Sequence, residues 1–168
     1  MTKIFSVLAL CVAAAVSAPC AHAADMTPQE LAQKFCDLHK DGTVEAEKAT
    51  MVLLTPSLKA AMEEGEKKSA EWQAAHPDEK PPLGDGVPFQ SYTDVAPECV
   101  AGKVSADGTE VDIEYRFPDQ PDANWTDRIR IATVDGKLLI DDVIYGVNDF
   151  QDSLRDSLAT MFDPPELE

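Results

Sequence analysis

The sequence predicts an α+β fold, in which N-terminal helices pack on a four-stranded antiparallel sheet and one more helix follows the sheet. Two observations predict it. Apolar residues recur every three or four positions up to about residue 76, but every second position from Cys99 to Tyr145. Two Asp-Gly pairs, at 107–108 and 135–136, each separate two alternating segments and so indicate hairpin turns.

The helical half divides at three threonines into predicted helices over residues 27–41, 43–54 and 55–76. Thr, Pro and Glu at the first start form a capping box, with Glu30 three residues after the N-cap. Gly42 follows the first helix, where a left-handed C-cap residue is expected. One stripe of the third helix carries Leu58, Met62, Gly65, Ser69 and Trp72.

A long irregular segment, residues 77–98, joins the two halves. Loops of this length are uncommon in compact domains and often carry function. We expect Phe89 and Tyr92 to hold its middle against the core.

The second half predicts strands over residues 100–105, 109–117, 125–134 and 137–145. In the second of them, Val111, Ile113, Tyr115 and Phe117 share one face, and Asp112, Glu114 and Arg116 share the other. Asn148 or Asp149 is the predicted cap of the last helix, whose apolar stripe would carry Phe150, Leu154, Leu158 and Met161, and Pro164-Pro165 would end it.

The Asp135-Gly136 turn fixes a register for the last hairpin if the turn has two residues. Arg130 would then face Asp141 as a structural ion pair across the strands. Asp142 would lie opposite Ile129 on the apolar face, at least partly buried. A carboxylate there needs a donor or a raised pKa. It would either hold the architecture together through backbone amides or act as the acid or base of a pocket.

The N-terminus has the form of a cleaved export signal over residues 1–23. Lys3 precedes an apolar run, residues 4–16, which is too short to span a bilayer, and Ala21-His22-Ala23 is a small-x-small cleavage site. Cleavage after Ala23 leaves one α+β domain over residues 24–168 in a periplasmic or secreted location, with no stable membrane anchor. Cys20 raises the alternative of lipidation, but Ser, Ala and Pro at 17–19 do not resemble a lipobox.

The net charge of the chain restricts the classes of partner that it can bind. The full chain has a net charge of −17. Without residues 1–23, whose only charged residue is Lys3, 13 basic and 31 acidic residues leave −18. Such a surface repels phosphate backbones, so nucleic acid is not an expected partner.

After cleavage of the signal, Cys36 and Cys99 remain as an even pair, which favours a disulfide worth about 4 kcal/mol in the chain-entropy model. His39 and His76 have no zinc-site spacing, so neither a metal nor another cofactor is expected.

Four segments together resemble an uncharacterised family of exported bacterial proteins, domain of unknown function 3828. They are Leu-Thr-Pro-Ser-Leu at 54–58, Gly-Val-Pro-Phe-Gln-Ser-Tyr-Thr-Asp at 86–94 followed by Cys99, Trp-Thr-Asp-Arg at 125–128, and Leu-Ile-Asp-Asp-Val-Ile-Tyr at 139–145. The resemblance implies a fold like that of nuclear transport factor two, with helices packed into a curved sheet to make a cone. Some members are lipoproteins, whereas this chain lacks a convincing lipobox. The family supplies no catalytic residues to carry over.

Three function classes remain at this point. The first is a non-enzymatic binding module for a protein or small ligand, with Asp142, Trp125, Tyr92 and Tyr145 as candidate pocket residues. The second is an isomerase- or hydratase-like enzyme that uses the buried carboxylate of Asp142 with Tyr145 or Tyr115. Asp142 and Tyr145 differ in parity along one strand, which weakens that pair. The third is a subunit of an envelope assembly.

Overall fold

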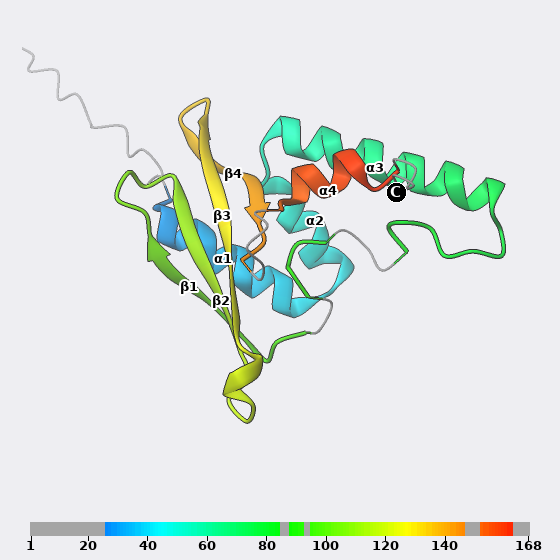
Figure 1. The fold of residues 1–168 in the computed structure, drawn as a ribbon. Coiled ribbons are helices and arrows are strands. Elements are labelled where there is room, and N and C mark those ends of the chain that lie inside the picture. The colour runs from blue at the N-terminus through cyan, green and yellow to red at the C-terminus, as the bar shows by residue number, and fades with distance from the viewer. Residues whose placement is uncertain (1–25, 85–87, 93–94, 147–151, 163–168) are drawn as a thin grey trace, which may run out of the picture.

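The computed structural model describes residues 26–84, 88–92, 95–146 and 152–162, and its fold is α+β (Figure 1). The predicted signal at residues 1–23, the predicted cap at Asn148 or Asp149 and the Pro164-Pro165 stop lie outside these residues. Three helices precede an antiparallel sheet with strand order β1-β2-β3-β4, and one helix follows it. The elements are α1 (Pro28–Asp41), α2 (Val44–Val52), α3 (Pro56–Ala75), β1 (Glu98–Val104), β2 (Glu110–Arg116), the short 3-10 helix η1 (Pro121–Ala123), β3 (Trp125–Val134), β4 (Lys137–Ile144) and α4 (Leu154–Thr160).

The three predicted threonine caps are confirmed. The hydroxyls of Thr27, Thr43 and Thr55 each accept the backbone N–H of the residue three positions later. Gly42 ends α1 with a φ of 62°, in the left-handed region. These starts and stops depend on local chemistry, which explains why the sequence located them.

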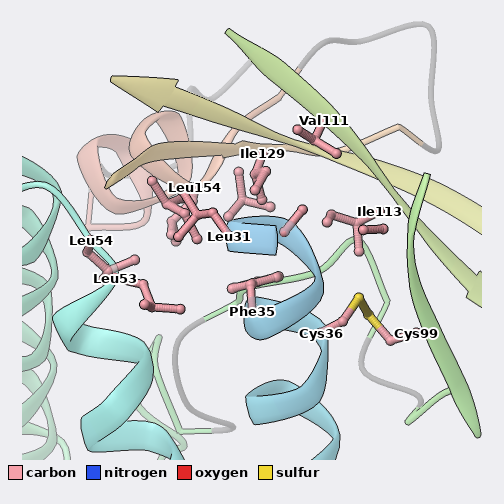
Figure 2. Packing of buried hydrophobic residues seen from close by; sticks show 14 of the residues in the cluster. Leu31, Phe35, Cys36, Leu53, Leu54, Cys99, Val111, Ile113, Ile129 and Leu154 are labelled. Atoms are coloured by element: carbon pink, nitrogen blue, oxygen red, sulfur yellow. A yellow bond between two sulfur atoms is a disulfide. The ribbon is translucent and has the colours of Figure 1, made fainter. Parts of the chain in front are cut away.

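Helix α1 lies across the inner face of the sheet and supplies the centre of the core (Figures 1 and 2). Leu31 and Phe35 are fully buried between the sheet and the α2–α3 connection, as Figure 2 shows. Beside them, Cys36 and Cys99 form the predicted disulfide, which ties α1 to β1. The first helix and the first strand are therefore joined both by apolar packing and by a covalent bond.

Each outer strand of the sheet is hydrogen-bonded at one residue to another part of the chain. On β1, the Gln29 side chain donates to the Ala101 carbonyl oxygen at 2.7 Å, and the Gln33 side chain accepts the Ala101 N–H at 3.1 Å. On β4, Ile140 exchanges two backbone hydrogen bonds of 2.8 Å with Leu53 and Thr55. This pairing ends α2 at Val52, two residues before its predicted end.

The predicted register of the last hairpin holds only from the turn to Ile140, which lies opposite Ile131. Asp135 and Gly136 both have positive φ, as the predicted type I′ turn requires. Beyond Ile140, however, Asp141 is an extra residue in a β-bulge, so Asp142 and not Asp141 lies opposite Arg130.

The predicted ion pair between Arg130 and Asp141 is therefore wrong. Arg130 pairs with Glu110 at 3.4 Å on the outer face of the sheet. Asp141 instead pairs with Arg155 of α4 at 2.7 Å and accepts the Thr55 hydroxyl at 2.9 Å. Arg155 also donates to the Asp141 carbonyl oxygen at 2.7 Å. These contacts from α3 and α4 hold Asp141 outside the strand ladder, which is the physical reason for the bulge.

The last helix starts later than predicted. Ser153 caps α4, and its hydroxyl accepts the N–H of Asp156. The N–H of Tyr145 donates to the Asp152 carbonyl at 2.9 Å, and Ile144 forms an antiparallel bridge with Ser153. Because these bonds keep residues 152 and 153 extended along β4, the helix begins only at Leu154. Leu154 and Leu158 of the predicted stripe are buried, as expected.

Candidate binding site

A buried carboxylate, Asp127 on β3, organises one end of the sheet. Its side chain is on the core face, only 1% exposed, and faces Ile113 of β2 in register. It accepts the N–H of Ser91 at 2.8 Å, that of Gly146 at 3.0 Å and the indole N–H of Trp125 at 3.2 Å. The Ser91 hydroxyl donates to it as well. Four donors offset the cost of burying this carboxylate.

Asp127 therefore joins three segments that are far apart in the sequence. Ser91 belongs to the long connection before β1, and Gly146 follows β4. Only glycine fits at position 146, because a Cβ there would lie 1.7 Å from the carbonyl oxygen of Thr126. The chain after β4 thus packs directly on the backbone of β3, next to the Asp127 carboxylate.

Two tyrosines complete this buried polar region. The Tyr145 hydroxyl donates to the Pro88 carbonyl oxygen, which fixes the start of the segment that contains Ser91. The Tyr115 hydroxyl is buried and is the one buried side-chain polar atom without a hydrogen-bond partner in the described part of the chain. Burial raises the pKa of both phenols well above the ordinary value, and the nearby Asp127 charge adds to the shift.

The aromatic rings next to Asp127 form the wall of a surface pocket. Tyr115 stacks on Trp125, with ring centroids 4.6 Å apart and an interplanar angle of 18°. Tyr92 meets Trp125 nearly at right angles at 5.1 Å, and Phe117 is tilted to it at 5.8 Å. Buried Tyr115 thus supports Trp125 from the core side, whereas Tyr92 is 45% exposed.

The pocket itself has a volume of about 250 Å³ and opens to solvent. It lies where β2 passes through η1 to β3, at the opposite end of β3 from the Asp135-Gly136 turn (Figure 1). Aromatic rings and polar side chains line it together: Tyr92, Phe117, Gln120, Asp122, Ala123, Asn124 and Trp125. Asn124 is fixed in place, because its side-chain oxygen accepts the N–H of Phe117 at 2.7 Å. The lining contains one carboxylate, Asp122, and no basic side chain.

The four candidate pocket residues separate into three places. Tyr92 and Trp125 line the same pocket. Tyr145 is not among the lining residues, and its hydroxyl donates to the Pro88 carbonyl oxygen. Asp142 does not line the pocket; it is 3% exposed and accepts the N–H groups of Val143 at 2.9 Å and Arg155 at 3.1 Å. Arg155 is the second residue of α4, so this carboxylate interacts with a helix start.

Sequence reasoning missed Asp127, although a signal for it was present. In the segment that begins at Trp125, the residues of one parity are Trp125, Asp127, Ile129 and Ile131. Period-two alternation places all four on the buried face, and the structure shows all four buried. The adjacent acids at 141 and 142 gave the more obvious indication of a buried charge.

A second pocket of about 230 Å³ lies on the outer face of the sheet, lined by Lys103, Ser105, Glu110, Asp112 and Arg128. Its charges already neutralise one another: Arg128 pairs with Asp112 at 2.9 Å and with Glu110 at 3.4 Å. Over the residues placed by the structure, no group of three or more His, Cys, Asp or Glu side chains could hold a metal ion.

The chain was compared with known protein families, proteins and structures. No family model, no curated protein and no solved structure matches this chain. The resemblance to domain of unknown function 3828 therefore stays a prediction. Within the described ranges, no helix combines the length and the apolar character needed to cross a membrane.

Proposed function

We propose that this protein is an exported, non-enzymatic binding module that holds a small ligand in the pocket lined by Tyr92, Trp125 and Phe117. The observation that carries the proposal is the construction of this pocket. An exposed aromatic ring, Tyr92, directly follows Ser91, whose N–H and hydroxyl both bind the buried Asp127. The pocket wall is thus held in position before any ligand arrives, which lowers the entropy cost of binding.

Export forms part of the proposal. The disulfide between Cys36 and Cys99 fits an oxidising compartment. The signal-like residues 1–23 and the small-x-small sequence before Asp25 favour cleavage after Ala23 and a periplasmic or secreted location. We also retain the fold resemblance to nuclear transport factor two as a hypothesis. Intact-mass measurement of the exported protein tests this part, and a chain that still carries residues 1–23 would contradict it.

The enzymatic alternative has less support. It needs a buried carboxylate that can exchange a proton with a substrate. The Asp142 carboxylate accepts two backbone N–H groups, one of them at the start of α4, and it is absent from the lining of the aromatic pocket. These contacts favour the architectural role that the sequence left open for Asp142.

A fluorescence assay tests the binding proposal, because the chain has only two tryptophans, Trp72 and Trp125. Trp72 lies on α3, stacked on His76, outside the pocket lining. In the W72F protein, emission therefore reports on Trp125. We expect at least one probe among choline, glucose and acetate to change this emission saturably, and the same change to require a higher probe concentration in W72F/Y92A. If none of the three probes does so, the pocket is not a small-ligand site.

A further inference from the structure

The aromatic pocket also indicates the chemical class of its ligand. We propose that it binds a compact organic cation, a quaternary ammonium group, by cation–π attraction. This inference rests on the proposed function, since it specifies the ligand of the same pocket.

The inclination of the rings fits a rounded cation. The pocket lining includes three aromatic side chains at different inclinations: Tyr92 is at 76° to Trp125, and Phe117 is at 37° to it. The apolar face of a sugar ring and the plane of a heterocycle stack best on one broad, parallel aromatic face. A rounded cation can lie against inclined rings wherever each ring turns a face toward it, because the negative quadrupole of a ring face attracts it.

The charge of the pocket lining also fits a cation. Asp122 contributes a carboxylate to the lining, and no Lys or Arg is among the lining residues. The Asp122 side chain is in an exposed residue of η1, so it can approach a bound cation without first leaving another partner in the core. The net charge of −17 favours the approach of cations over a longer range and disfavours anions.

The arrangement of polar groups suits a quaternary ammonium group as well. The indole N–H of Trp125 is used by Asp127, and the side-chain oxygen of Asn124 is used by the N–H of Phe117. The indole N–H is therefore not available to a sugar hydroxyl, and one of the two lone pairs of the Asn124 oxygen is already used. A quaternary ammonium group has no hydrogen-bond donors, so it needs neither group.

The matched probe pair is choline and its neutral carbon isostere, 3,3-dimethylbutan-1-ol, titrated into the W72F protein at fixed ionic strength. We expect the neutral isostere to bind at least about fivefold more weakly, as the loss of a cation–π contact predicts. Tetramethylammonium, which lacks the hydroxyl, should retain most of the choline affinity. Equal binding of choline and the isostere, or binding of glucose only, would overturn the cation proposal and leave the binding module standing. No binding by any probe would remove both.

Variants locate the site. Y92A should weaken choline binding roughly fivefold to thirtyfold, and Y92F should restore it because the ring face remains. D122N should weaken binding roughly twofold to fivefold, as for an exposed ion pair. The control is D119N, which removes the same charge from the same loop outside the pocket lining. If D119N weakens choline binding as much as D122N does, the effect comes from overall charge, and Asp122 does not contact the ligand.

Discussion

The Asp127 carboxylate accepts the backbone N–H of Ser91 at 2.8 Å, so a single buried charge connects β3 to the segment that carries Tyr92. The same carboxylate binds the indole N–H of Trp125, the other side of the candidate pocket. Core stability and pocket shape therefore depend on the same residue, which leads to the first prediction.

D127N should destabilise the fold by about 2–4 kcal/mol, because an amide offers only one acceptor oxygen to four donors and turns its own N–H groups toward them. Urea unfolding monitored by circular dichroism measures the effect. The matched control is D112N, which alters a carboxylate on the outer face of the sheet and should change stability by less than about 1 kcal/mol. Equal effects of the two variants would contradict the role given to Asp127.

G146A should lower the free energy of unfolding by more than about 3 kcal/mol, since the added Cβ would overlap the Thr126 carbonyl oxygen. G42A is the comparison. Gly42 has a φ of 62°, and a Cβ added to it would meet no atom within 4 Å, so its replacement should cost only about 1 kcal/mol of backbone strain. The prediction fails if both alanine variants unfold at the same denaturant concentration.

Y115F should leave stability within about 1 kcal/mol of the wild type or increase it, because the buried Tyr115 hydroxyl has no partner to lose. Y145F, by contrast, removes the hydrogen bond to the Pro88 carbonyl oxygen and should cost about 1 kcal/mol. Thermal unfolding of the two variants side by side tests the difference. A larger loss for Y115F than for Y145F would show that the Tyr115 hydroxyl has a bound partner in solution.

The Asp107 carboxyl should titrate near pH 2. Hydrogen bonds from the Ser105 and Thr109 hydroxyls and from the Thr109 N–H lower its pKa to about 2. Because the folded pKa lies below the unfolded value, this carboxylate stabilises the hairpin above about pH 4, and that contribution disappears as the pH falls through about 2. Carbon-detected NMR titration measures it, and S105A/T109V should return the midpoint toward about 4. A wild-type midpoint near 4 would rule out these hydrogen bonds in solution.

Replacing both cysteines, in C36S/C99S, should reduce stability by about 4 kcal/mol through the added freedom of the unfolded chain. Without reductant, a thiol-alkylating reagent should leave the wild-type Cys36 and Cys99 unmodified even in denaturant. Modification of either residue under these conditions would show that the protein lacks the bond.

The starts of the first three helices and the buried face of β2 were predictable because they depend on neighbouring residues: a threonine cap, a proline at the next position, an alternation of apolar side chains. The bulge at Asp141 was not, because its cause is distant in the sequence. Arg155 belongs to α4, outside the hairpin, and the two-residue turn at Asp135-Gly136 gives no sign of its contact with Asp141. Asp142 is buried as predicted, but it lies opposite Arg130 and not Ile129. Its carboxylate accepts a backbone N–H at the start of α4.

The candidate site was predicted only in part. Tyr92 and Trp125 share a pocket with Phe117, which alternation placed at the end of the second predicted strand, yet Asp122 and Asn124 come from a loop whose path no periodicity describes. Asp127 follows the alternation of β3 and was predictable from the residues next to it. Its donors at Ser91 and Gly146 were not, because they come from segments without regular structure.

The two glutamines of α1 that bind Ala101 also affect how copies of the protein meet. Together they present to β1 one acceptor and one donor, as a neighbouring strand would. The backbone N–H and C=O of Ala101 are already hydrogen-bonded, so a strand of a second molecule cannot pair with them to extend the sheet into a fibril. At high concentration the protein should accordingly resist amyloid formation. A Q29A/Q33A variant should form amyloid more readily than the wild type.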